Sequence, residues 1–207
     1  MFGQVDIDMI AGPSEIGVIA DDSANPVHLA ADLLSQAEHD PRARAIMVTT
    51  SESLANAVSD EVERQLKLLP RENIARPAIE NNSYIAVMDS VEDMFTVMNE
   101  VAPEHLEIQL PDPMSYMSLV QNAGSVFLGA YASEPLGDYV DGTNHVLPTS
   151  GTARFSSPLG VYDFVKRTSF TQFTKERLEE VAIHITTLAR TEGLEAHARA
   201  IEVRLEK

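Results

Sequence analysis

Residues 16–20, Ile16-Gly17-Val18-Ile19-Ala20, and residues 45–49, Ala45-Ile46-Met47-Val48-Thr49, are two short runs of mainly apolar side chains. Short apolar runs of this kind are typical of buried strands in a parallel sheet. Between them Asn25-Pro26 favours the start of a helix, because proline suits the first helical turn. Strand, crossover helix and strand form the repeating unit of an α/β fold, so this stretch decides the fold class.

The same alternation continues to residue 128. Ser51 is expected to cap a second helix, whose apolar stripe consists of Leu54, Val58, Val62 and Leu66 and which closes by Pro70. Further strands are predicted at residues 84–88, 106–110 and 125–128, with a helix capped by Ser90 and another around residues 114–120. Strands that alternate with helices predict a mostly parallel sheet with helices on both faces.

From residue 151 onward the pattern changes. Residues 151–157 show no clear period, and from Thr174 the chain is expected to be helical, with one apolar stripe before Gly193 and another after it. We therefore expect a partial α/β domain over residues 1–150 and a mainly helical C-terminal segment over residues 151–207.

Composition excludes several classes of protein. The 207 residues are 44% hydrophobic, enough to bury a substantial core. A formal net charge of −17 argues against a nucleic-acid partner. The absence of cysteine excludes disulfides and thiolate ligands and leaves His, Asp, Glu and Gln as possible metal ligands. Without a membrane-length apolar run or a signal-peptide pattern, the sequence predicts a cytoplasmic protein that does not enter a membrane.

Two polar groups of residues could form a ligand site. Residues 137–149 place Asp138 and His145 in a loop bounded by glycines and a proline, although such a loop is also a common surface connection held by its own hydrogen bonds. Gln36 and His39 lie three residues apart on a predicted helix, so both point to one side and could converge on a ligand. An amphipathic helix with a polar border is the simpler interpretation of that pair.

Other candidates lie where the chain enters strands or ends helices. Glu104 and His105 follow Pro103 at a strand entry, and adjacent carboxylate and imidazole groups are suited to removing a proton from an alcohol. Ser14 offers a hydroxyl in a turn, Glu192 precedes the Gly193 break, and His197 lies in an apolar helical stripe. Each candidate also has a simpler interpretation. Glu104 and His105 can be solvated polar residues at a strand edge, and Ser14 can belong to a simple turn. Glu192 can cap a helix, and His197 can be a hydrogen-bonded histidine in a core or an interface.

Taken together, five groups of residues resemble the ordered motifs of the histidinol dehydrogenase family, and the similarity extends over essentially the whole chain. The groups are Gly12–Glu15, Asp32–Asp40, Pro103–Glu107, Gly137–Thr149 and Gly193–Ala198. The resemblance implies an enzyme that oxidises L-histidinol to L-histidine through histidinaldehyde, with Zn2+ and NAD as cofactors. It also implies an incomplete Rossmann-like sheet, because the chain matches only the C-terminal half of the usual family chain.

The resemblance assigns roles to individual residues. The zinc ligands fall on Gln36, His39, Asp138 and His197. The acid–base pair falls on Glu104 and His105, with His105 as the base toward the alcohol and Glu104 activating water for the aldehyde step. The residues expected to bind histidinol are Ser14, Gln36, His39, His105, Asp138, His145, Glu192 and His197. The family is expected to be homodimeric, with the C-terminal segment bringing Glu192 and His197 to the partner's site.

Activity of this chain by itself is left open by the sequence. The half that it lacks carries most of the family's NAD contacts, and no G-x-G-x-x-G stretch replaces them. We expect weak binding of zinc and histidinol without reduction of NAD. The alternatives are a non-catalytic zinc- and histidinol-binding module, or one half of a split heteromeric enzyme. A zinc hydrolase with Glu104 as base would need an open water position, which four protein ligands tend to close.

Overall fold

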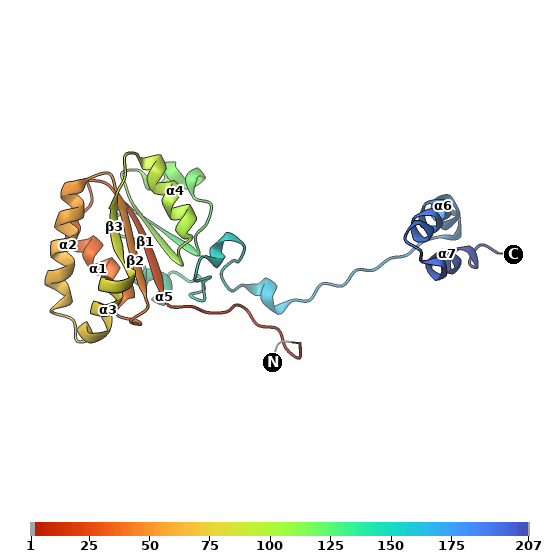
Figure 1. The fold of residues 1–207 in the computed structure, drawn as a ribbon, viewed down its shortest axis with the longest axis horizontal. Helices are drawn as coiled ribbons and strands as arrows, with labels where there is room; N and C mark the ends of the chain where they lie inside the picture. Colours follow the sequence, from red (N-terminus) through yellow and green to blue (C-terminus); the bar gives the residue numbers. More distant parts are fainter. Residues whose placement is uncertain (1–2, 207) are drawn as a thin grey trace. The chain divides into compact units, whose positions relative to one another are not determined.

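The chain forms two compact units, seen in the ribbon of Figure 1. The computed structural model describes residues 3–206. Contacts group the chain into Met1–Phe164 and Val165–Lys207. The division expected after residue 150 falls inside the first unit, which includes the short 3-10 helices η2 (Thr152–Arg154) and η3 (Val161–Phe164).

The first unit is built on a five-stranded sheet with the strand order β3-β2-β1-β4-β5, and every pair of neighbours is parallel. The strands are β1 (Glu15–Ala20), β2 (Arg44–Thr49), β3 (Tyr84–Val87), β4 (His105–Gln109) and β5 (Ser125–Leu128). The central strands β1 and β4 are buried along their whole length. The predicted strands and the α/β class are confirmed.

Helices cover both faces of this sheet (Figure 1). One hydrophobic cluster joins the sheet to α1 (Pro26–Ala37), α2 (Glu52–Leu66) and α3 (Glu72–Asn82), and a second joins it to α4 (Val91–Val101). The side chains of Asn25, Ser51 and Ser90 each accept a hydrogen bond from a backbone N–H in the first turn of α1, α2 and α4. These caps satisfy donors that a helix start leaves free, and they confirm the predicted helix starts.

Two elements differ from the sequence-based expectation. Helix α3 has no counterpart in the expected pattern, because Pro77 lies in its interior and proline normally interrupts a helix. The helix expected around residues 114–120 is the 3-10 helix η1 (Pro113–Leu119). Its Ser115 hydroxyl donates to the carbonyl oxygen of Asp112 at 2.8 Å, a side-chain bond that competes with regular helical bonding.

The second unit consists of two helices that pack on each other, α6 (Lys175–Thr191) and α7 (Glu195–Glu202). Thr174 caps α6 by accepting from the N–H of Arg177. Gly193 separates the helices with a φ of 76°, a left-handed conformation that glycine adopts without strain at a helix end. The helical character predicted for this segment is confirmed. Within residues 3–206, no helix has the length and apolar character that crossing a membrane requires.

Candidate active site

The predicted site residues gather at the amino-terminal ends of β1 and β4. Ser14 precedes β1, Glu104 precedes β4, and His105 is the first residue of β4. The crossover helix α1 runs back toward this edge and carries Gln36 in its last turn. His39, expected on the same helix, lies in the turn after the C-cap Glu38, where its N–H donates to the carbonyl oxygen of Gln36. Open α/β sheets usually bind ligands at the opposite, carboxyl edge.

A cavity of about 320 Å³ lies at this edge of the sheet. It is lined by Ser14, Gln36, His39, Glu104, His105, Glu134, Asp138, Tyr139 and His145. Glu134 and Asp138 come from the segment that follows β5. Glu134 is the N-cap of α5 (Pro135–Tyr139), Asp138 lies within α5, and both line the cavity. The structure thus brings together every predicted site residue except Glu192 and His197. These two belong to the second unit, at the C-cap of α6 and on α7, and both are exposed.

The backbone of Glu15 holds both members of the predicted acid–base pair. Its N–H donates to Oε2 of Glu104 at 3.0 Å, and its carbonyl oxygen lies 3.0 Å from Nδ1 of His105. A carbonyl oxygen can only accept, so Nδ1 carries the proton and Nε2 of the neutral ring has a free lone pair. Nε2 lies 3.6 Å from Oε1 of Glu134, and both residues line the cavity. His105 is therefore held in the form in which Nε2 can accept a proton.

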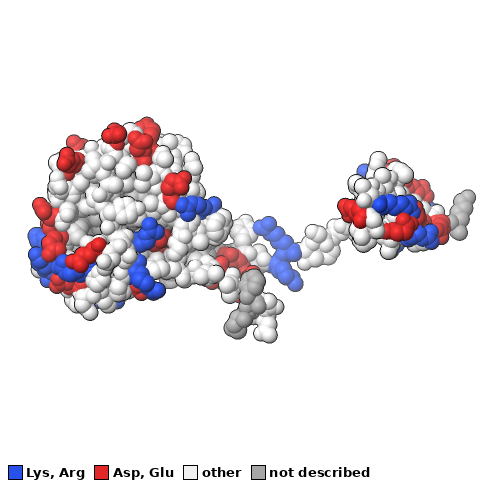
Figure 2. Space-filling view, viewed as in Figure 1, with Lys and Arg blue, Asp and Glu red and all other residues white. Residues whose placement is uncertain are grey.

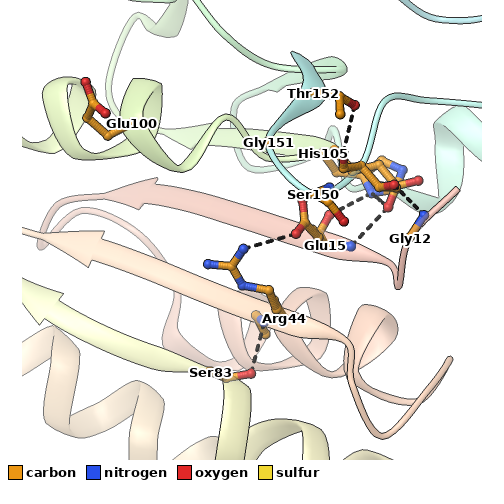
Figure 3. Close-up of polar contacts among 12 residues, drawn as sticks. Gly12, Glu15, Arg44, Ser83, Glu100, His105, Ser150, Gly151 and Thr152 are labelled. Atoms are coloured by element: carbon orange, nitrogen blue, oxygen red, sulfur yellow. Dashed lines mark hydrogen bonds and ion pairs between the residues drawn. The ribbon is translucent and has the colours of Figure 1, made fainter. Parts of the chain in front are cut away.

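The side chain of Glu15 ties the end of the polar loop to the start of β1 (Figure 3). Its carboxylate accepts from Nη1 of Arg44 at 3.2 Å and from the backbone N–H of Ser150 at 3.2 Å. The N–H of Gly12 donates to Oγ1 of Thr149 at 2.6 Å. These bonds fix the backbone on either side of Ser14 and just beyond His145, both of which line the cavity.

The main chain around Glu104 is fixed from the other side by β5. The N–H of Gly124 donates to the carbonyl oxygen of Pro103 at 3.0 Å, and the N–H of Ser125 donates to that of Glu104 at 2.9 Å. A Cβ atom at position 124 would lie 2.5 Å from the Glu104 carbonyl oxygen. Glycine is required there because the two backbones approach closely.

Burial changes the proton affinity of the acid–base pair. Burial raises the pKa of Glu104 to about 7, with smaller contributions in the same direction from neighbouring carboxylates, although the hydrogen bond from the Glu15 N–H opposes it. Burial lowers the pKa of His105. Near neutral pH the imidazole is therefore neutral and Glu104 can change its protonation state, which are the properties of groups that accept and return protons.

Behind the cavity lies a buried acidic group that the sequence reasoning missed. Burial raises the pKa of Glu134, and the nearby Asp138 carboxylate raises it further. The Glu134 N–H donates to Oε1 of Glu107 at 3.0 Å. Burial raises the pKa of Glu107 to about 9, and the neighbouring Asp32 carboxylate contributes in the same direction. Glu107 is therefore protonated near neutral pH.

A sequence signal for this acidic group exists. Glu107 is a carboxyl residue inside the strand β4, which is buried along its whole length. Asp32 adjoins Leu33, a residue of the apolar stripe of α1. Buried carboxyl groups are rare unless they are paired. Two of them in predicted core positions indicate a shared proton, but only the three-dimensional structure shows that they face each other.

The cavity has properties that suit a bound cation. Nε2 of Gln36 and Oε1 of Glu134 are buried, and neither has a hydrogen-bond partner among the described residues. Such atoms are costly unless a ligand satisfies them, and the Gln36 amide can turn its oxygen toward a cation. Potential ligand atoms of His105, Glu134 and Asp138 lie within 4.8 Å of one another. Imidazole, carboxylate and amide oxygen are donors that zinc accepts.

A parallel α/β fold with a neutral, tautomerically fixed histidine beside a protonatable carboxyl group is an arrangement suited to an enzyme that transfers protons. The family model described as histidinol dehydrogenase matches residues 1–205. A histidinol dehydrogenase from Lactiplantibacillus plantarum is 69% identical over 206 residues, which are 100% of this chain and 48% of that protein. One from Streptococcus mutans is 63% identical over 207 residues, again 100% of this chain and 48% of that protein.

A solved structure agrees with these relatives. The crystal structure of histidinol dehydrogenase from Elizabethkingia anophelis matches with a TM-score of 0.88 and 44% identity, over 97% of this chain and 46% of that chain. The chain belongs to the histidinol dehydrogenase family, whose members are oxidoreductases. It spans about half the length of the curated relatives that it matches.

Proposed function

We propose that this chain is the part of a histidinol dehydrogenase that carries the acid–base pair and most of the zinc ligands. The reaction is the oxidation of L-histidinol to L-histidine through histidinaldehyde, with two equivalents of NAD as oxidant, in cytoplasmic histidine biosynthesis. The observation that carries the proposal is the fixed tautomer of His105, a residue that lines the cavity and whose Nε2 is free to accept a proton.

In the first oxidation, Nε2 of His105 removes the proton of the substrate hydroxyl as the adjacent carbon loses a hydride. The Glu15 carbonyl oxygen, 3.0 Å from Nδ1, stabilises the imidazolium that results. In the second step, Glu104 removes a proton from water as the water adds to the aldehyde, and the hydrate then loses the second hydride to give the carboxylate. A pKa of about 7 for Glu104 matches this role near neutral pH.

The cofactor roles follow from the family resemblance and the donor set of the cavity. When bound, zinc would anchor the imidazole and amino groups of the substrate, and NAD would accept the hydrides. Gln36, His39 and Asp138 would hold the zinc from this cavity, with His197 as the fourth ligand. Ser14 and His145 would contact histidinol from the same cavity. No residue of this chain is assigned to NAD.

The second unit is proposed to complete a site in a homodimer. Glu192 is the C-cap of α6 and His197 lies on α7. The apolar α6 residues Ile183 and Leu188 are 65% and 64% exposed. Exposed apolar side chains of this size on neighbouring turns favour a protein surface as partner. In the proposed dimer, Glu192 contacts histidinol and His197 binds zinc in the partner's site.

Zinc binding tests the ligand assignment in this chain alone. Titration calorimetry with zinc is expected to show weak binding that His39→Ala abolishes. His28→Ala is the matched control, because His28 is an exposed histidine on α1, the helix that precedes His39, and lies outside the cavity. Equal loss of zinc binding in the His39→Ala and His28→Ala variants would reject His39 as a zinc ligand.

Catalysis is tested after the other half of the family chain has been supplied, as the unmatched part of the Lactiplantibacillus plantarum relative. His105→Ala is then expected to keep the zinc and to lower kcat by about 10²–10⁴-fold. Loss of zinc in this variant would contradict the proposed role of His105.

A second candidate function, which the sequence leaves open, is one half of a split heteromeric enzyme. Activity restored by mixing two separately made halves would support it. NAD reduction by this chain alone would show that catalysis does not require the other half, and it would reject the split enzyme. A non-catalytic binding module is the remaining alternative, and it predicts histidinol binding without turnover even after mixing.

A further inference from the structure

Glu107 is a carboxyl residue that the proposed reaction does not use, and it lies in the interior of the first unit. On the face drawn in Figure 2, acidic side chains of this unit lie at the surface, several of them beside basic ones. Glu107 is instead 0% exposed. A buried carboxyl group is unfavourable unless polar partners compensate it, so the partners of Glu107 indicate its role.

The sheet register places Glu107 on the face that carries the site. Alternate side chains of a strand point to the same face of a sheet, so Glu107 shares a face with His105, two residues earlier in β4. Its register neighbours are Val18 in β1 and Phe127 in β5. Val18 belongs to the hydrophobic cluster that joins the sheet to α1. Glu107 therefore lies between the sheet and the elements that surround the cavity.

The short helix α5 begins with a main-chain N–H that Glu107 satisfies. The first helical residue is a proline, which has no N–H, and the N–H of Leu136 donates to the carbonyl oxygen of Ser133 at 3.1 Å. The buried N–H of Glu134 donates to Oε1 of Glu107 at 3.0 Å. The side chain of Glu134 makes no capping bond to α5. Because a buried N–H without a partner is unfavourable, Glu107 stabilises the start of α5 from inside the sheet.

A second contact holds α5 against the same part of the sheet. A Cβ atom at position 137 would lie 2.8 Å from Cζ of Phe127, the register neighbour of Glu107 in β5. Helix α5 thus meets two adjacent strands, β4 through a hydrogen bond and β5 through a close contact that glycine permits. Two contacts on neighbouring strands fix the position of a helix that has only five residues.

Helix α5 carries two residues of the cavity, Glu134 at its N-cap and Asp138 one turn later. Residues four apart on a helix lie on the same side. We propose that Glu107 is a positioning residue, which holds the N–H of Glu134 and thereby sets where α5 presents Glu134 and Asp138 to the cavity. The hold on α5 follows from the fold alone. Its effect on zinc rests on the proposed function, in which Asp138 is a ligand.

Glu107 fills this position as a neutral group. Burial raises its pKa to about 9, and the Asp32 carboxylate contributes in the same direction. Its second oxygen, Oε2, accepts from Nε2 of Gln109 at 3.2 Å. A glutamine at position 107 can keep an oxygen on the Glu134 N–H, because the Gln109 amide can turn its own oxygen toward the new NH2 group. A leucine of similar size offers no acceptor, so the two substitutions separate shape from hydrogen bonding.

Hydrogen exchange of the Glu134 amide tests the hold on α5. In the wild-type chain this amide is expected to exchange as slowly as the amides of β4, although the first amides of a short helix usually exchange quickly. Glu107→Leu is expected to speed the exchange at least about tenfold, and Glu107→Gln to leave it unchanged. Fast exchange in the wild-type chain, which is decisive even if Glu107→Leu does not fold, or equal exchange in the two variants would overturn the proposal.

Zinc titration calorimetry on the same variants tests the effect on the cavity. Glu107→Leu is expected to weaken zinc binding about 10–100-fold, as the loss of a group that orients a metal ligand does, and Glu107→Gln to retain it. Val18→Ala is the control, because it removes a buried side chain beside Glu107 and takes part in neither contact of α5. It should lower the stability of the chain and leave its zinc affinity unchanged.

Failure of the positioning role can be told apart from failure of the proposed function. Faster exchange in Glu107→Leu with unchanged zinc affinity, or an equal loss of zinc binding in Val18→Ala, would overturn the positioning role. A wild-type chain that binds no zinc would count against the proposed function alone. The exchange of the Glu134 amide would then decide by itself whether Glu107 holds α5.

Discussion

The two units of this chain bury their side chains to very different degrees. In the first unit, β1 and β4 are wholly buried, and the carboxyl groups of Glu15 and Glu107 lie inside. In the second unit, α6 and α7 bury only the small residues Thr186, Ala189 and Ala198. The first unit therefore positions its chemical groups from its own core. The second unit holds its candidate residues Glu192 and His197 in exposed positions, outside any core of its own.

The largest expected effect follows from separating the units. A peptide of residues 165–207 is expected to lose most of its helical circular dichroism signal, because short helices with little burial are marginal in water. A chain of residues 1–164 is expected to unfold in one cooperative transition. A cooperative thermal transition in the isolated peptide would contradict the comparison.

Truncation of one leucine in each unit sharpens the difference. Leu29 is fully buried at 0% exposure, and Leu188 is 64% exposed. Leu29→Ala is expected to lower the free energy of unfolding by about 2–5 kcal/mol, because it leaves a cavity in the core. Leu188→Ala is expected to change it by less than about 0.5 kcal/mol. Urea denaturation measures both, and similar losses would mean that the second unit has a core of its own.

The pH dependence of stability distinguishes the buried acids from the exposed ones. The folded chain raises the pKa of Glu107 to about 9 through burial and the nearby Asp32, so folding favours the protonated form. The contribution of Glu107 to stability is thus complete below about pH 4.5 and is lost as the pH rises toward 9. Glu107→Gln, which needs no proton, is expected to be more stable than wild type by about 1–3 kcal/mol at pH 9.

The same variant should differ little from wild type well below pH 4.5, where Glu107 is protonated in both the folded and the unfolded chain. Glu192→Gln in the second unit is the control, since Glu192 is exposed, and it should leave stability unchanged at both pH values. A stabilisation by Glu107→Gln that is equal at low and high pH would show that proton uptake is not its cause.

The smallest expected effect concerns helix caps of the same kind in the two units. Ser90 caps α4 and Thr174 caps α6, each by accepting from a backbone N–H. Ser90→Ala is expected to lower the free energy of unfolding of the first unit by about 1 kcal/mol. Thr174→Ala should reduce only the helical signal of α6. A shift of the main unfolding transition by Thr174→Ala would show that the two units unfold together.

Local signals in the sequence were sufficient for much of the fold. The apolar runs at residues 16–20 and 45–49 and the caps Asn25, Ser51 and Ser90 act within a few residues, so the strands and helix starts could be predicted. Helix α3 could not, because Pro77 interrupts the local pattern. Its stability includes a contact between helices, in which Arg76 pairs with Glu63 of α2 as well as with Glu72 and Glu80.

The candidate site likewise contains residues that the sequence predicts and one residue that it does not predict. Gln36, His39, Glu104 and His105 belong to recognisable motifs, and the structure places all four at one cavity. Glu134 was missed because its contacts with Glu107 and His105 join residues far apart in the sequence. The metal and substrate roles of the site residues stay predictions, which zinc titration and the kinetics of the His105→Ala variant would test.

The close approach at Gly124 has a consequence for the genetics of this chain. Every missense change of a glycine codon adds at least a Cβ atom, and here that atom would meet the carbonyl oxygen of Glu104. In a selection for activity, position 124 should therefore tolerate no replacement at all, although its residue has no side chain to offer a substrate. A mutational scan would rank it with the catalytic residues, and only a structural measurement on Glu104 would reveal that its role is to leave room.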